Sequence, residues 1–203
     1  MVGVENASYD QEVMEARRNE LTRLAAWAAE VLVDPRTVVL DTETTGLHGP
    51  VRIVDLAVVT PHREILLDTL INPSVPIPRD ATDVHHITDE MVVDAPQFAD
   101  VVVELAEVLT SRRVVIYNVT YDTGVLRGEL GRLLVDRVDA STVVSGWMCL
   151  ADYEDAMVPY SNWVGERNGR RGDYTWQKLG GGHRALEDCY AVVDRLEEMA
   201  ASA

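Results

Sequence analysis

Hydrophobic and polar positions along the chain follow two periods, one typical of helices and one typical of strands. Residues 10 to about 33 place apolar side chains at helical spacing, and Asp34-Pro35 ends that helix. Runs rich in Val, Ile and Leu follow, as expected for strands. We predict strands at about 37–43, 51–60, 64–71, 113–118 and 138–143.

Apolar spacing of three to four residues returns in the later part of the chain and predicts further helices. We expect these helices at about 80–85, 88–94, 97–110, 121–134, 144–157 and 184–201. The segment 159–182 is rich in glycine and aromatic residues and has no long apolar period. Early strands followed by alternating helix and strand predict an α/β fold with a mixed sheet. We divide the chain into an N-terminal helical extension, 1–35, and one domain, 36–203.

Composition narrows the class of protein. The 203 residues are 47% apolar and 26% charged, which is ordinary for a folded chain with one substantial core. No apolar run is long enough to span a membrane, and the acidic N-terminus does not resemble a secretory signal. A cytoplasmic location without membrane contact is expected.

The net charge of −16 argues against nucleic acid as a partner, because such a field repels polyanions over most of the surface. It does not exclude nucleic acid, since a carboxylate cluster that binds divalent cations presents a positive centre locally.

Two acids end the first predicted strand, in the stretch VVLDTETTGL. Residues i and i+2 of a strand face the same side, so Asp41 and Glu43 present two carboxylates together while Thr42 points away. Like charges this close destabilise one another unless a proton or cation lies between them. Hard oxygen ligands select Mg²⁺ or Mn²⁺. The stretch indicates either a metal site or a solvated strand end with a turn.

Two further acids and a histidine are candidates for the same site. Asp122 follows the buried strand VVIYN and opens a helix, where acids also serve as ordinary N-terminal residues. Asp188 lies one turn into the last helix, among core-facing positions. His183 follows three glycines, which leave the backbone free to fold the imidazole over a nearby site. Imidazole titrates near neutral pH, as a general base requires.

Three motifs, in order along the chain, resemble those of the DnaQ-like, or DEDDh, 3′–5′ exonucleases, a family that includes the proofreading epsilon subunit of bacterial replicative polymerases. The motifs are DTETTGL, NVTYDTGVL and HRALEDC, and the segment ATDVHHITDEMVVDAPQF is similar to the family's linker between the first two. The resemblance covers about 36 to 200. It implies a ribonuclease H-like fold, in which helices flank a five-stranded mixed sheet whose second strand is antiparallel.

The resemblance also implies a set of site residues and an activity. His183 matches the family's general base, because it lies five residues before the last acid, and Arg184 occupies the position where related enzymes use tyrosine. The implied reaction releases nucleoside 5′-monophosphates from 3′ ends, with two Mg²⁺ or Mn²⁺ ions clamping the phosphate. The acids that match the metal ligands are Asp41, Glu43, Asp122 and Asp188.

Residues that would contact substrate follow from the same resemblance. We expect Leu47 to wedge against the terminal base, and each candidate also has an ordinary structural explanation, as core or turn residue. The candidates are Thr44, Thr45, Leu47, His86, Ile87 and Asn118.

Two features depart from the family pattern. The second motif has Tyr117 and Tyr121 where the family usually has His and Phe, and the hydroxyl of Tyr121 needs a partner if it is buried. Within 159–182, four basic residues exceed two acids, and three aromatic residues lie among them, so this segment either guides a single strand or covers the sheet edge. The residues are Arg167, Arg170, Arg171, Lys178, Glu166, Asp173, Trp163, Tyr174 and Trp176.

The leading hypothesis is a metal-dependent 3′–5′ exonuclease acting on single-stranded or frayed 3′ ends of DNA or RNA. The alternatives are a non-catalytic module that binds nucleic-acid ends or proteins, and a polymerase-associated proofreading subunit. The N-terminal helix is the candidate surface for a protein partner or for self-association, and the favoured alternative is that it packs against its own domain.

Overall fold

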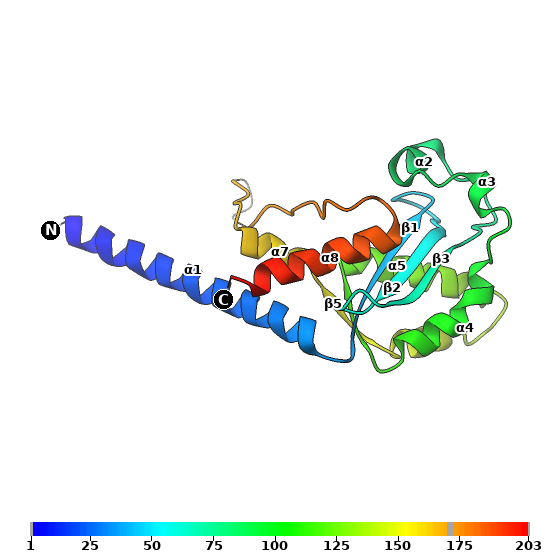
Figure 1. Cartoon of the computed structure of the whole chain (residues 1–203), viewed down its shortest axis with the longest axis horizontal. Coiled ribbons are helices and arrows are strands. Elements are labelled where there is room, and N and C mark those ends of the chain that lie inside the picture. Colours follow the sequence, from blue (N-terminus) through cyan, green and yellow to red (C-terminus); the bar gives the residue numbers. More distant parts are fainter. Residues whose placement is uncertain (1, 170–172, 203) are drawn as a thin grey trace.

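The computed structural model describes residues 2–169 and 173–202, with side chains from residue 11 onward (Figure 1). Helices and strands alternate through most of the chain. In order they are α1 (Val2–Val33), β1 (Thr37–Thr44), β2 (Ile53–Val59), β3 (Ile65–Leu70), α2 (Arg79–His85), α3 (Asp89–Val92), α4 (Phe98–Leu109), β4 (Arg113–Ile116), α5 (Val119–Leu133), α6 (Ala140–Met148), β5 (Asp152–Asp155), α7 (Met157–Val164) and α8 (Ala185–Ala200).

The strands form one five-stranded sheet in the order β3-β2-β1-β4-β5. β2 pairs antiparallel with both β1 and β3, whereas β1, β4 and β5 run parallel. The predicted mixed sheet with an antiparallel second strand is therefore confirmed. The parallel strands β1 and β4 end at the same edge of the sheet, where open α/β sheets place their ligands.

Helices cover both faces of the sheet, so the molecule has three layers (Figure 1). One face packs Val38, Leu40 and Val114 against α4 and α5. The opposite face packs Val39 and Val115 against α1 and α8. This division decides on which side of the sheet each polar residue at the end of β1 lies.

Helix α1 begins earlier than the apolar pattern predicts, at Val2 instead of about residue 10. Its second half packs on α8 through Ala28 and Val31, while its first half extends beyond the rest of the molecule (Figure 1). The division into an extension and a domain remains a prediction. Within the described residues, no helix combines the length and the apolar character needed to cross a membrane.

Two predicted elements in the later half of the chain are wrong. The region 138–143 lies mostly in α6 and not in a strand, because its valines have no neighbouring strand to pair with and Val138 is exposed. The fifth strand is instead Asp152–Asp155, inside the predicted helix 144–157. It pairs with β4 at the edge of the sheet and is partly exposed, so its acidic sequence carries no apolar alternation.

Candidate active site

Alternation along β1 divides its polar side chains between the two faces of the sheet. Asp41 and Glu43 share the face of Val39, which is covered by α1 and α8. Thr42 shares the face of Leu40, which is covered by α4 and α5. The helix that carries Asp188 therefore lies on the side of the first two acids, and the helix that carries Asp122 lies on the other.

Asp188 meets Asp41 and Glu43 from the first turn of α8. One carboxylate oxygen from each of these three residues lies within 4.8 Å of the others. The backbone N–H of His183 donates to Asp188 Oδ1 at 3.3 Å. Gly181 lies so close to the Asp188 carboxylate that the Cβ of any other residue would overlap it. The glycine run thus lets the backbone approach the third acid.

Burial and mutual repulsion raise the pKa values of these acids. The pKa of Glu43 rises from 4.5 to about 8, first through burial and then through the charge of Asp188. Burial also raises the pKa of Asp41 well above its ordinary value, and the charges of Asp122 and Glu43 add to the effect. The pKa of Asp188 is raised, mainly by burial. Such a group is relieved by protons or by a bound cation.

Asp122 lies beside this group but is turned toward the other face of the sheet. Its Oδ1 accepts a hydrogen bond from Thr42 Oγ1 at 2.7 Å, and its side chain is buried. Burial raises the pKa of Asp122, and the Thr42 hydrogen bond opposes that shift. The structure therefore brings three of the four predicted acids into one cluster and places the fourth near enough to act on Asp41 by charge.

A fifth acid, which the sequence analysis did not single out, supports the cluster. Asp55 lies directly opposite Glu43 in the β1–β2 register and is fully buried. Its Oδ2 accepts from Arg184 Nε at 2.7 Å and from the backbone N–H of Ala185 at 3.2 Å. The signal was available, because a lone acid inside the apolar run IVDLAVV requires a buried partner.

His183 follows the glycines and precedes the pair formed by Arg184 and Asp55. Its backbone lies in the left-handed region, with φ of 59°, and its side chain is exposed. Within the described residues, its imidazole makes no hydrogen bond, so the ring is free to turn toward a substrate. Arg184 and Ala185, which follow it and are both bonded to Asp55, fix the position of the His183 backbone.

A pocket of about 570 Å³ adjoins the acids and receives three of the predicted substrate residues, Thr44, Thr45 and Leu47, together with Glu43. Leu47 is 74% exposed, which leaves its side chain available to a ligand. Thr44 and Thr45 are buried and hold the turn: Thr44 Oγ1 donates to the Gly46 carbonyl at 2.9 Å, and Thr45 Oγ1 accepts from the backbone N–H of Arg52 at 3.0 Å.

The remaining substrate candidates lie in different surroundings. Ile87 is fully buried in a small core cluster with Val54, so its side chain does not reach the pocket. His86 is exposed in the left-handed region at the end of α2, and Asn118 adopts the same conformation before α5, where it lines a separate hollow of about 450 Å³.

His85, and not His86, faces the predicted substrate pocket. It is buried, its Nε2 lies 3.2 Å from the Thr44 carbonyl, and its Nδ1 accepts from the backbone N–H of Ile87 at 3.0 Å. The helical spacing from the buried Ala81 could have identified it, since residues four apart share a helix face.

The two tyrosines that depart from the family pattern both find hydrogen-bond partners. Tyr121 donates to the Gly46 carbonyl at 2.7 Å, which ties α5 to the turn after β1. Tyr117 donates to the Gln177 carbonyl at 2.8 Å, which ties the end of β4 to the segment that leads to His183. Both hydroxyls thus brace the surroundings of the acids.

Different residues of the segment 159–182 agree with different interpretations, one that it covers the sheet edge and one that it guides a single strand. Trp163 stacks on Tyr160 and packs on the core, as a covering residue would. Trp176 is 69% exposed. The predicted basic residues Arg170 and Arg171 lie outside the described residues.

The donor set fits a divalent cation. Carboxylates of Asp41, Glu43 and Asp188 are hard oxygen ligands, of the kind that Mg²⁺ or Mn²⁺ prefers. The raised pKa values and the close approach of Gly181 are what a cluster arranged around positive charge requires. Beside an exposed histidine and a pocket, such a cluster can bind a phosphate group only through divalent cations that it holds.

Comparisons with known proteins agree with this chemistry. Residues 38–196 match the family model RNase_T, described as exonuclease. The "Uncharacterized exonuclease CP81" of Escherichia phage 186 is 34% identical over 188 residues, covering 85% of this chain and 92% of the phage protein. The DNA polymerase III subunit epsilon of Treponema pallidum is 36% identical over 94 residues, 44% of each chain.

Solved structures show the same fold. Exonuclease I of E. coli, in complex with a dA16 oligonucleotide, superposes with a TM-score of 0.56 at 17% identity. The match covers 82% of this chain and 42% of that enzyme.

Proposed function

Because the chain belongs to the RNase_T exonuclease family, we propose that it is a metal-dependent 3′–5′ exonuclease that releases nucleoside 5′-monophosphates from DNA or RNA. The observation that carries this proposal is the convergence of Asp41, Glu43 and Asp188 within 4.8 Å, with Asp122 alongside. Burial and repulsion keep protons on such a cluster up to about neutral pH, and divalent cations of the kind that nucleases use at the scissile phosphate would replace those protons.

The acids would hold two Mg²⁺ or Mn²⁺ ions. Asp41, which interacts electrostatically with all the others, would contact both ions, and Glu43 and Asp188 would complete one ligand set. Asp122 would support the second ion from the Thr42 side of the strand. When bound, such ions neutralise the scissile phosphate and stabilise the attacking and leaving oxygens.

His183 would take the proton from the attacking water. Its exposed imidazole lies next to Asp188, and its backbone N–H is bonded to that carboxylate. The neighbouring Arg184 is held by Asp55, so the histidine can change its side-chain rotamer without displacing the start of α8. This combination of a movable ring and a fixed backbone suits a general base.

The terminal nucleotide would occupy the pocket between the β1 turn and α2. Leu47 would pack against its base, and the backbone around Thr44 and Thr45 would face its sugar. His85 would fix the Thr44 carbonyl, and His86 lies at the exposed end of α2. Asn118 would lie near the preceding part of the strand, in the hollow on the other side of Tyr121.

The test is to incubate the protein with DNA and RNA oligomers labelled at either end, in the presence of Mn²⁺. We expect stepwise shortening from the 3′ end with release of 5′-mononucleotides, and the polymer that is shortened faster is the preferred substrate. An Asp188→Asn variant serves as the inactive control. Internal cleavage, shortening from the 5′ end, or no cleavage of either polymer would refute the proposal.

The non-catalytic alternative is disfavoured by the sequence, since every acid and the histidine of the family pattern is present. The epsilon subunit of T. pallidum, 36% identical over 94 residues, supports a proofreading role as the second candidate. In that case, the projecting half of α1 is the surface for a protein partner or for self-association (Figure 1). Co-purification with a polymerase subunit, lost on deletion of residues 2–12, which precede the part of α1 that contacts the α7 region, would favour this candidate.

A further inference from the structure

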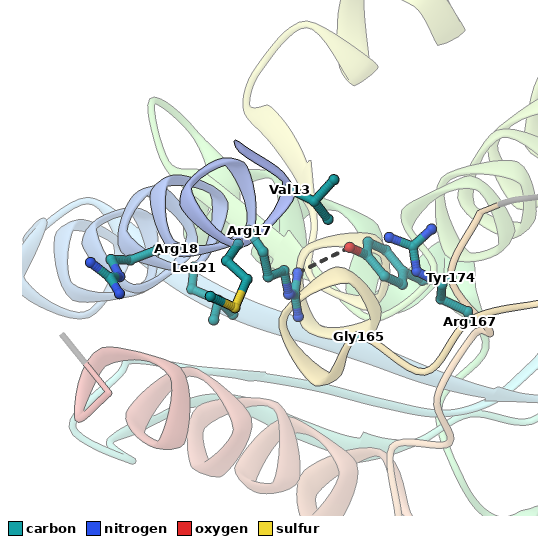
Figure 2. A pocket seen from close by; sticks show the side chains of 8 residues that line it. Val13, Arg17, Arg18, Leu21, Gly165, Arg167 and Tyr174 are labelled. Carbon is teal, nitrogen blue, oxygen red and sulfur yellow. Dashed lines mark hydrogen bonds between the residues drawn. The ribbon is translucent and has the colours of Figure 1, made fainter. Parts of the chain in front are cut away.

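A second pocket, of about 490 Å³, lies between α1 and the segment that follows α7 (Figure 2). Its charged lining consists of Arg17, Arg18 and Arg167, on a chain whose net charge is −16. Among the described residues, no carboxylate lines it. Glu20 pairs with Arg17 from outside at 2.6 Å, which leaves the other two arginines to give the pocket its positive charge.

Arg17 builds the pocket and is not available to a ligand. Its guanidinium donates to the carbonyls of Asn162 and Trp163 at 2.8 and 2.9 Å, and it faces the Tyr174 ring at 5.1 Å. Arg167 lies against the same ring at 5.9 Å (Figure 2). Tyr174 therefore joins α1 to the segment that follows α7 and holds Arg167 at the pocket.

The pocket also has an apolar part. Met14 and Val13, on α1, are 65% and 43% exposed and line it beside the arginines. A site with exposed guanidinium groups next to apolar surface suits a ligand that is both anionic and flat-faced, as a nucleic-acid strand is. It suits a free inorganic anion less well, because an anion gains nothing from apolar contacts.

The chain itself leads from this pocket to the candidate active site. The connection between α7 and α8 passes along α8 toward the end of β1 (Figure 1). Gln177 anchors it, because its backbone N–H donates to Ser161 Oγ at 3.0 Å and its carbonyl accepts from Tyr117. The residues on either side of Gln177, Trp176 and Lys178, are exposed. An aromatic and a basic side chain thus lie between the pocket and the acids.

We propose that the surface leading from the pocket to the acids binds the single strand upstream of the 3′ end that is being hydrolysed. We call this surface the track; its residues are Arg18, Arg167, Trp176 and Lys178. Arg18 and Arg167 would hold phosphates at its far end, Trp176 would stack on a base, and Lys178 would contact a phosphate nearer the acids. The proposal rests on the exonuclease function proposed above. It explains how an acidic protein retains a polyanion, because the basic residues lie where the strand must pass.

The track has a definite reach. Tyr174 and His183 are nine residues apart, so the segment spans at most about 30 Å. At about 3.4 Å per stacked nucleotide, roughly nine nucleotides cover it. The KM of the wild-type protein should therefore fall with strand length and become constant at a length of no more than roughly nine nucleotides.

The test compares two substrates in the same protein. The p-nitrophenyl ester of thymidine 5′-monophosphate reaches only the acids, whereas a single strand of about 20 nucleotides also reaches the pocket. In the double variant Arg18→Glu/Arg167→Glu, we expect KM for the strand to rise about tenfold or more. The slope of log KM against log salt concentration should decrease by about two, which corresponds to the loss of two phosphate contacts. Hydrolysis of the ester should be unchanged.

A matched control carries the same charge change elsewhere. Arg23→Glu/Arg137→Glu alters two arginines that do not line the pocket, and its KM for the strand should rise much less. If KM for the strand rose equally in the two double variants, the effect would come from net charge and not from these positions, and the proposal would be overturned. An unchanged KM accompanied by an altered oligomeric state in size-exclusion chromatography would also overturn it and would assign the pocket to a second copy of the chain. Failure of the wild-type protein to hydrolyse either substrate would instead refute the exonuclease function.

Discussion

Arg184 Nε donates to Asp55 Oδ2 at 2.7 Å, and this bond joins the start of α8 to the middle of β2. Asp55 also accepts the backbone N–H of Ala185, so one carboxylate holds two successive residues. His183 precedes this anchored pair, and Asp188 follows it by one helical turn. The positions of a proposed base and a proposed metal ligand therefore depend on one buried acid.

Replacing Asp55 by Asn should loosen that anchor while preserving its size. We expect kcat to fall about 10- to 100-fold, the range found when residues that orient metal ligands are changed. The midpoint of Mn²⁺-induced thermal stabilisation should move to higher Mn²⁺, and the free energy of unfolding should fall by about 1–3 kcal/mol. Glu104→Gln, an exposed acid on α4, is the control. An unchanged kcat in Asp55→Asn would remove its positioning role.

Replacing His183 by Ala should separate chemistry from metal binding. We expect turnover to fall about 10²- to 10⁴-fold, as for loss of a general base. The rise in melting temperature on addition of Mn²⁺ should persist, because the metal response depends on the acids. His62→Ala, exposed in the turn between β2 and β3, should retain full activity. A fully active His183→Ala protein would show that another group takes the proton.

The sequence predicts those parts of the site that depend on local periodicity. The two-residue spacing of Asp41 and Glu43 fixes their common face whatever the rest of the fold. Local periodicity could not predict toward which face of the sheet the Asp122 side chain turns. Its hydrogen bond with Thr42 forms only because α5 covers the face opposite to that of Asp41 and Glu43.

Pairing between distant segments limits what can be predicted elsewhere. The strand Asp152–Asp155 has no apolar alternation, and it forms because β4 offers it a parallel edge. The valine-containing region 138–143 has no such edge and lies mostly in a helix. Local composition therefore favoured the wrong segment, and only tertiary contacts decide the matter.

Replacing Asp41 by Asn should stabilise the protein without metal and abolish its response to metal. Burial and the charges of Asp122 and Glu43 make the Asp41 carboxyl costly to ionise in the folded protein, and a neutral amide avoids that cost, so the melting temperature in EDTA at pH 8 should rise by a few degrees. Addition of Mn²⁺ should then give no further rise. Glu187→Gln, whose exposed side chain lies beside Asp188, is the matched control and should keep the response. A metal-induced rise of wild-type size in Asp41→Asn would contradict its role as a ligand.

Without divalent ions, stability should fall as the pH rises from 7 to about 9. The pKa of Glu43 in the folded protein is about 8, raised from 4.5, and a raised pKa stabilises the fold only while the group can stay protonated. That contribution is complete below about pH 4.5 and is lost as the pH passes through about 8. The raised pKa values of Asp41 and Asp122 act in the same direction.

Measuring stability only from pH 7 upward avoids an opposing effect from the titration of His85. Burial lowers the pKa of His85 from 6.5, so its contribution to stability increases with pH and is complete above that value. Urea midpoints measured in EDTA at pH 7, 8 and 9 should therefore decrease, and the decrease should be smaller in Glu43→Gln. With Mn²⁺ present, the trend should vanish or reverse, since the ion replaces the protons that the acids lose. Midpoints that rise with pH in EDTA would show that the acids do not repel one another as the structure indicates.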